Sequence, residues 1–161
     1  MTAPTPIKKA LKPADVEVFA ETIGHYFERI TGEKALVRTA YLLETEPPPQ
    51  DDFNGMIIVH GSYQGSVCFA APRGLLTHVL MRMGQQEYSD ADHLDIVGEI
   101  ANTLAGRARR VLGEGLEITP PHTYTRAGRA LPSPASGTPL VIPFTWQIYA
   151  AVLVVHLDVL G

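Results

Sequence analysis

The sequence has very little cysteine and no long hydrophobic run. Its 161 residues include one cysteine, Cys68, so no disulfide can form within the chain, which suits a reducing compartment. The longest apolar stretch, Ile148 to Val155, is far shorter than the ~20 residues that span a bilayer. Residues 1–12 also lack the apolar core of a signal peptide. We therefore expect a cytoplasmic protein that does not insert into a membrane.

Basic charge and metal-ligand patterns are scarce as well. The formal net charge is -4, and the adjacent basic residues are limited to Lys8-Lys9 and Arg109-Arg110. A nucleic-acid-binding protein would normally show a basic stripe, so we expect no nucleic-acid partner. The 6 histidines are scattered without ligand spacing, which argues against a metal site. Cys68 lies in an apolar run and is predicted to be a small side chain of the core.

The composition predicts one globular domain over residues 1–161. Hydrophobic residues make up 45% of the chain and charged residues 19%, an ordinary balance for a folded protein. We expect the folded core to cover about residues 14–158 and residues 1–12 to be flexible. No internal repeat and no interdomain linker is evident.

Hydrophobic periodicity predicts three helices and several short strands. The predicted helices cover about residues 14–30, 75–83 and 91–112. The predicted strands cover residues 36–44, 56–60, 66–70, 117–119, 123–125, 140–146 and 149–159, with residues 61–65 as a hairpin turn and residues 131–139 as a loop. Helices and antiparallel hairpins in this order favour an α+β fold, in which a mainly antiparallel sheet packs against two or three helices.

The long helix over residues 91–112 is amphipathic. Ser89, Asp90 and Asp92 give it an N-cap and an acidic first turn. At ~100° per residue, one side is apolar and must face the core. That stripe contains Val97, Ile100, Ala101, Leu104, Ala108 and Val111. The opposite, solvent-facing side contains Asp95, Glu99, Asn102, Gly106 and Arg109.

Glu99 and Asn102 are the candidate functional pair on this exposed side. They are three residues apart and therefore neighbours on the helix surface. Gly106 follows one turn later and Gly98 lies close by, although glycine costs ~1 kcal/mol relative to alanine within a helix. Small residues beside a polar pair leave room for another backbone to approach. Alternatively, Gly98 and Gly106 ease helix packing within the fold itself.

Residues 95 to 106 read DIVGEIANTLAG. This run resembles the signature helix of the CheC/CheX chemotaxis phosphatases, whose active core is Glu, two residues, then Asn, followed by an aliphatic residue and Gly. Residues 61–67 are similar to the family's hairpin, and residues 116–121 to its Pro-containing segment after the helix. The final strands, with Pro143-Phe144, are similar too, and the resemblance covers about residues 14–158 in the same order.

The resemblance implies a phosphatase that hydrolyses the phospho-aspartate of a CheY-like response regulator, in chemotaxis or other two-component signalling. In the family the receiver domain supplies Mg²⁺ and a lysine, so no cofactor of this chain's own is implied. Glu99 would pair with that lysine, and Asn102, whose carboxamide both donates and accepts hydrogen bonds, would orient the attacking water. Around this catalytic pair, the predicted partner-binding residues are Asp95, Gly98, Gly106 and Arg109.

A single Glu/Asn pair is present, because in the first helix Glu21 is followed three residues later by Gly24 and Glu28 by Thr31. This resembles CheX-type members rather than CheC-type ones, which usually carry two pairs. CheX-type members commonly form homodimers through sheet edges, and the apolar terminal strands are candidates for that contact.

Two segments depart from the family pattern, namely residues 46–52 and the Pro-rich residues 131–139. Two other kinds of function also stay open at this stage. One is a non-catalytic CheX-like module that binds a receiver or a flagellar-switch protein, and its mark would be loss of Glu99 or Asn102. The other is a small-molecule-binding α+β domain, which would need an apolar pocket with a few polar groups.

Overall fold

The computed structural model describes residues 11–113 and 115–159. Its helices are α1 (Pro13–Thr31), α2 (Arg73–Arg82) and α3 (Asp90–Leu112). Its strands are β1 (Leu36–Val37), β2 (Tyr41–Leu42), β3 (Phe53–Gly61), β4 (Tyr63–Ala71), β5 (Leu116–Ile118), β6 (His122–Thr125), β7 (Leu140–Trp146) and β8 (Tyr149–Val159). Of the segment 1–12 that was predicted to be flexible, residues 1–10 lie outside the described part.

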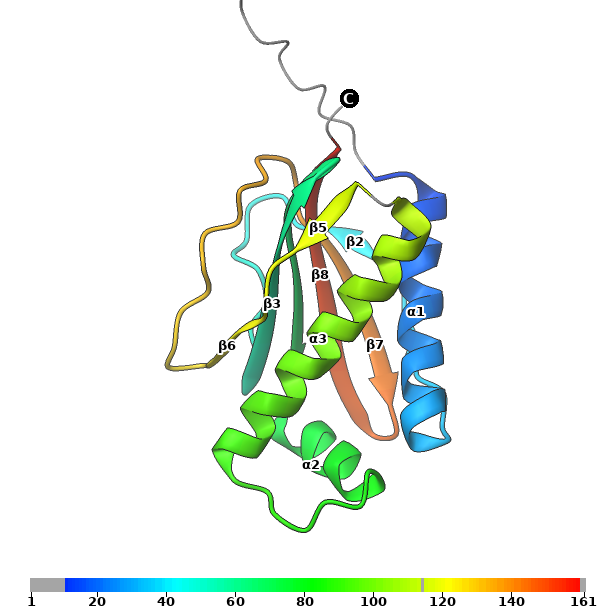
Figure 1. Cartoon of the computed structure of the whole chain (residues 1–161), viewed down its shortest axis with the longest axis vertical. Coiled ribbons are helices and arrows are strands. Elements are labelled where there is room, and N and C mark those ends of the chain that lie inside the picture. Colours follow the sequence, from blue (N-terminus) through cyan, green and yellow to red (C-terminus); the bar gives the residue numbers. More distant parts are fainter. Residues whose placement is uncertain (1–10, 114, 160–161) are drawn as a thin grey trace, which may run out of the picture.

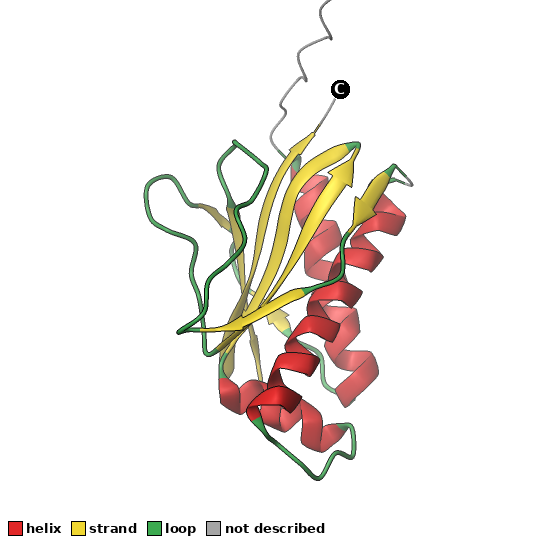
Figure 2. Cartoon of the chain, turned by 60° about the vertical axis from the view of Figure 1, so that its left-hand side comes forward, coloured by secondary structure: helices red, strands yellow, loops and turns green. Residues whose placement is uncertain are grey.

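The described strands form one antiparallel sheet in the order β1-β7-β8-β4-β3-β5, in which β2 also pairs with β7 and β6 with β3. α1 and α3 lie on one face of this sheet, with α3 running diagonally across it, and the short α2 lies at the lower end of the sheet (Figure 1). The loops before β3 and between β6 and β7 cover the other face (Figure 2). This arrangement confirms the predicted α+β fold, including the long helix.

The main core lies between the helices and the sheet. α1 contributes Phe27, whose ring packs at 5.5 Å from Phe144 and 5.7 Å from Trp146, measured between ring centroids. α3 lies unusually close to β3, because a Cβ atom placed on Gly55 would come within 2.7 Å of the carbonyl oxygen of Val97. Glycine at this strand position therefore lets the helix backbone rest directly on the sheet.

The prediction of one continuous strand over residues 36–44 is wrong. Only two short pieces, β1 and β2, pair with β7, and residues 38–40 leave the ladder. The backbone N–H of Arg38 still donates to the carbonyl oxygen of Pro143, at 2.7 Å. Pro143 has no N–H to donate in return, so the ladder is interrupted beside it.

The β3–β4 hairpin is tighter than predicted, whereas β7 and β8 have the predicted bounds. β3 and β4 extend to Gly61 and Tyr63, so Ser62 alone separates them. The link between β7 and β8 is a turn at Gln147 and Ile148, in which Gln147 adopts a φ of 56°. The side chain of Gln147 donates to the carboxylate of Glu33, a tertiary contact that supports this uncommon backbone conformation.

The terminal strands do not form a sheet edge, contrary to expectation. β8 lies between β4 and β7, and β7 is covered by β1 and β2. The outermost strands are the short pairs β1 with β2 and β5 with β6. Of these, β1 and β2 expose the larger apolar side chains, with exposed fractions of 58% for Leu36, 47% for Tyr41 and 60% for Leu42.

Candidate functional site

The candidate site is built on α3, whose first turn is held firmly. The hydroxyl of Ser89 accepts a hydrogen bond from the backbone N–H of Asp92, and the Asp92 carboxylate accepts one from the backbone N–H of Ser89. These hydrogen bonds from Ser89 lower the pKa of the Asp92 carboxyl. Asp90 pairs with Arg73 of α2 at 2.6 Å. The predicted capping roles of these residues are confirmed, and the register of α3 is fixed from its start.

The burial pattern along α3 follows the predicted amphipathic division. Five of the residues assigned to the core side are buried, namely Val97, Ile100, Ala101, Leu104 and Ala108. The side chain of Val111 is outside the described ones. Asp95, Glu99, Asn102 and Arg109 are exposed, and Gly106 is half-buried. The helix therefore presents an acid and an amide to solvent, one turn apart, on a rigid support.

Glu99 has a neighbour on α1 that the sequence pattern did not reveal. Tyr26 is buried, and burial raises the pKa of its hydroxyl, with a smaller upward contribution from the Glu99 carboxylate. The guanidinium of Arg107 acts in the opposite direction on the same pKa. The periodicity of α1 marks Tyr26 only as a core residue, so its position beside the candidate pair depends on how α1 packs against α3.

Among the described residues, the hollow beside Glu99 is too small for a substrate. A small hollow lies between α3 and the end of α2, lined by Met83, Gln85, Asp95 and Glu99 among others, and its volume is about 60 Å³. A water molecule takes up about 30 Å³ of liquid. The hollow is thus far smaller than an ordinary ligand pocket of ~300–1,000 Å³. The acid and amide are thus exposed on an open helix surface rather than enclosed in a ligand-sized pocket of the described residues.

Comparison with known proteins identifies the chain. The sequence model of the family described as Chemotaxis phosphatase CheX matches residues 53–145, which include all of α3. The chain belongs to the CheX family. The predicted membership is confirmed, and the matched range contains the run from Asp95 to Gly106 on which the resemblance was based. No curated protein matches the chain.

Solved structures of CheX-family and related proteins share the fold. Chemotaxis protein CheX from Vibrio vulnificus is 21% identical with a TM-score of 0.78, over 89% of this chain and 99% of that one. A CheC-like superfamily protein from Shewanella sp. PV-4 is 17% identical with a TM-score of 0.78, over 94% and 100%. The CheX of a CheX-CheY-BeF3-Mg²⁺ complex from Borrelia burgdorferi is 15% identical with a TM-score of 0.67, over 88% and 96%.

The two glycines near Glu99 and Asn102 occupy different environments. A Cβ atom on Gly98 would meet the Cγ2 methyl of Thr123 at 2.8 Å and the ring of Pro121 at 3.3 Å. Gly98 is thus buried under the chain's own Pro-containing segment, which favours the packing alternative for this residue. A Cβ atom on Gly106 would meet nothing within 4 Å. The prediction that a partner approaches Gly106 stays open.

Other predicted features of the chain are placed as follows. Cys68 is half-buried and points away from the helices, where its sulfur lies 3.6 Å from the hydroxyl of Tyr124. Cys68 packs against a second, smaller buried cluster of Leu43, Val141 and Val154, which agrees with its prediction as a small hydrophobic side chain. Because alternate residues of β4 face opposite sides of the sheet, this cluster is separate from the main core under the helices. Among the described residues, no group of three or more His, Cys, Asp or Glu side chains is placed to hold a metal ion. No described helix has the length and apolar character needed to cross a membrane.

Proposed function

We propose that this CheX-family protein hydrolyses the phospho-aspartate of a CheY-like receiver domain. α3 would dock on the receiver, and Glu99 and Asn102 would enter the receiver's active centre together. The observation that carries the proposal is the exposure of this pair on a helix where the described residues beside Glu99 leave only a small hollow. Such a surface suits a catalyst whose substrate is another protein's phosphorylated side chain.

Asn102 would position the water that attacks phosphorus. Its carboxamide can accept a hydrogen bond from the water and donate one to a phosphoryl oxygen, and it stays neutral at any working pH. The water oxygen forms a new bond to phosphorus while the bond to the aspartate oxygen breaks, which releases inorganic phosphate and a free carboxylate. Phosphoryl transfer depends mainly on such positioning and on charge neutralisation, so a strong base is not required.

Glu99 would fix the helix on the receiver. Its exposed carboxylate would pair with the receiver's active-site lysine, and the receiver would also supply the Mg²⁺ that neutralises the phosphoryl oxygens. A relative from Borrelia burgdorferi forms a complex with CheY, BeF3 and Mg²⁺, which is the type of partner that the proposal requires. Asp95 and Arg109 are exposed on the same helix and would contact the receiver around the pair, with Gly106 allowing a close approach.

We further propose that the protein forms a homodimer through the edge made by β1 and β2. Leu36, Tyr41 and Leu42 expose apolar side chains there, whereas β7 and β8 are inside the sheet. This edge is on the opposite side of the sheet from β5 and β6, so a dimer would leave α3 accessible. The proposal keeps the cytoplasmic location expected from the sequence, because receiver domains act there.

The experiment measures phosphate release from receivers that have been phosphorylated with acetyl phosphate in the presence of Mg²⁺. Each CheY-like receiver encoded in the same genome is tested, with this protein present at one-twentieth of the receiver concentration. We expect at least one receiver to lose its phosphoryl group faster, with many turnovers for each molecule of this protein. Glu21→Ala, an exposed acid-to-alanine change on α1, serves as the matched control and should keep full activity.

The alternative of a non-catalytic module gives a different result. A module of that kind would bind a receiver, as seen by calorimetry, but would leave the rate of phosphate release unchanged. Binding without acceleration would therefore contradict the proposed hydrolysis while keeping the receiver as partner.

A further inference from the structure

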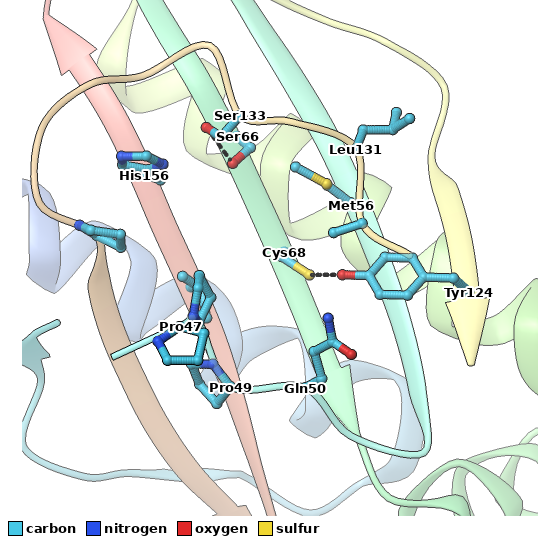
Figure 3. A pocket seen from close by; sticks show the side chains of 14 residues that line it. Pro47, Pro49, Gln50, Met56, Ser66, Cys68, Tyr124, Leu131, Ser133 and His156 are labelled. Atoms are coloured by element: carbon cyan, nitrogen blue, oxygen red, sulfur yellow. Dashed lines mark hydrogen bonds between the residues drawn. The ribbon is translucent and has the colours of Figure 1, made fainter. Parts of the chain in front are cut away.

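The sheet face opposite α3 is covered by two loops that the family resemblance does not account for. One loop runs from Leu43 to Asp52 and contains the three prolines 47–49, and the other connects β6 to β7. Figure 2 shows both on the side of the sheet away from the helices. Figure 3 shows that residues from both loops line one pocket above β3, β4 and β8.

Both loops are anchored to the sheet by specific hydrogen bonds. In the β6–β7 loop, the backbone N–H groups of Ser136 and Gly137 donate to the buried carboxylate of Asp158 at 2.9 and 3.1 Å. His156 donates to the carbonyl oxygen of Gly137 at 2.6 Å. In the first loop, the fully buried amide of Asn54 donates to the carbonyl oxygen of Asp51 at 3.0 Å. Hydrogen bonds to the sheet therefore fix the position of the loop backbone that covers the space beneath.

That space is a cavity of about 410 Å³. Its volume lies within the ~300–1,000 Å³ range of ordinary ligand pockets. Most of its lining is apolar, including the prolines 47–49, Met56, Leu131 and Val154. Among the described residues, no Asp, Glu, Lys or Arg side chain lines it.

The polar groups of the cavity are few, and several are paired with each other. The Ser66 hydroxyl donates to the Ser133 hydroxyl at 2.9 Å, and Cys68 contacts the hydroxyl of Tyr124 at 3.6 Å (Figure 3). Burial raises the pKa of the Cys68 thiol to about 11 and also raises the pKa of Tyr124, so both stay protonated near neutral pH. Gln50 and His156 also line the cavity, and the His156 ring is engaged by the carbonyl oxygen of Gly137. With no acidic, lysine or arginine side chain among the described lining residues, an ionised ligand finds no permanent countercharge, whereas a neutral one finds hydroxyl groups within reach.

We propose that this cavity binds an uncharged, largely apolar small molecule of two to three rings with one hydrogen-bonding group. An apolar cavity of ~150 Å³ takes up one benzene molecule, so about 410 Å³ accommodates two to three times that size. The apolar part of the ligand packs against the prolines and Leu131. Its polar group meets the hydroxyl groups of Ser66, Ser133 or Tyr124.

The site is separate from the candidate pair on α3 but shares its support. Met56 and Cys68 face each other across β3 and β4 and line the cavity. Gly55, the neighbour of Met56, carries the backbone of α3 on the opposite face. One layer of sheet therefore separates the cavity from the helix that bears Glu99, and a bound molecule leaves the exposed side of α3 uncovered.

The test uses 6-propionyl-2-dimethylaminonaphthalene, a neutral two-ring fluorophore with one carbonyl acceptor, titrated with the purified full-length protein. We expect saturable binding of one fluorophore per chain with a shift of its emission to shorter wavelength. Leu131→Asp places a charge at a 42% exposed position of the cavity mouth and should weaken binding at least tenfold. Cys68→Phe fills part of the cavity and should have a similar effect.

Ile148→Asp is the matched control, because it makes the same kind of change at a 91% exposed turn outside the cavity, and it should bind the fluorophore as the unmodified protein does. Circular dichroism and thermal melting check that each variant is folded, and if Cys68→Phe fails to fold, Leu131→Asp decides alone. Equal binding by all variants, or no saturable binding, would overturn the proposal. It would also be overturned if Leu131→Asp converted a dimer to a monomer, since the cavity would then be a contact between two copies of the chain.

Discussion

The two faces of the sheet carry opposite kinds of surface. On the helix face, α3 exposes charged and amide side chains beside a hollow of only about 60 Å³. The loop face encloses about 410 Å³ of mostly apolar space without acidic or strongly basic lining residues among those described. The helix face is therefore suited to acting on a site in another protein, and the loop face to enclosing a small neutral molecule.

Removing the amide from the helix face is expected to have the largest effect. Asn102→Ala should reduce phosphate release by about a hundred- to a thousandfold, the scale for loss of one preorganised polar group in an active site. Receiver binding, followed by calorimetry, should change little, because docking depends mainly on Glu99. If Asn102→Ala kept the turnover rate of the unmodified protein, Asn102 would not be the residue that positions the water.

Removing the acid should affect docking and turnover together. Loss of one member of a desolvated interfacial charge pair typically costs ~2–5 kcal/mol. Glu99→Ala should therefore weaken receiver binding by that amount, and phosphate release at low receiver concentration should fall in parallel. Binding of the naphthalene fluorophore on the opposite face should not change. If Glu99→Ala weakened fluorophore binding as well as receiver binding, the two faces would not be independent.

On the loop face, the thiol of Cys68 should make stability depend on alkaline pH. Its pKa is raised from 9.0 to about 11 by burial, so the folded chain keeps this proton when the unfolded chain has lost it. The free energy of unfolding is therefore expected to fall between about pH 9 and 11, by up to about 3 kcal/mol from this group. Urea unfolding across this range should show a shallower decline for Cys68→Ala. An equal decline would contradict the burial of this thiol.

The smallest expected effects come from the same substitution made at the two glycines of α3, Gly98 and Gly106. Gly98→Val should lower the free energy of unfolding by about 1–3 kcal/mol, because its side chain would collide with Thr123. Gly106→Val should change stability by no more than ~0.5 kcal/mol, since its surroundings are open. If a receiver approaches Gly106 closely, that variant should instead bind the receiver more weakly. Denaturation and calorimetry on both variants separate the two effects.

Features that depend on local sequence were predictable. The capping of α3 by Ser89, the exposure of Glu99 and Asn102 and the burial of Leu104 all follow from spacing within one helix. The turn at Gln147 was not predictable in the same way, because its positive φ accompanies a contact with the distant Glu33.

Features that depend on distant contacts were missed. Tyr26 comes near Glu99 only through the packing of α1 on α3. The break at residues 38–40 reflects Pro143, which lies far along the chain on the paired strand. The cavity exists because two loops meet over the same face, and neither loop has a periodic pattern that would predict this.

The proline at position 143 has a consequence for the behaviour of the protein at high concentration. Long, regular outer strands tend to recruit further chains into open-ended aggregates. Here β1 and β2 are two residues each, and the gap between them lies beside Pro143. Pro120 and Pro121 interrupt the opposite margin in the same way, between β5 and β6. Concentrated solutions should therefore resist fibril formation, even with apolar groups such as Leu42 in contact with water.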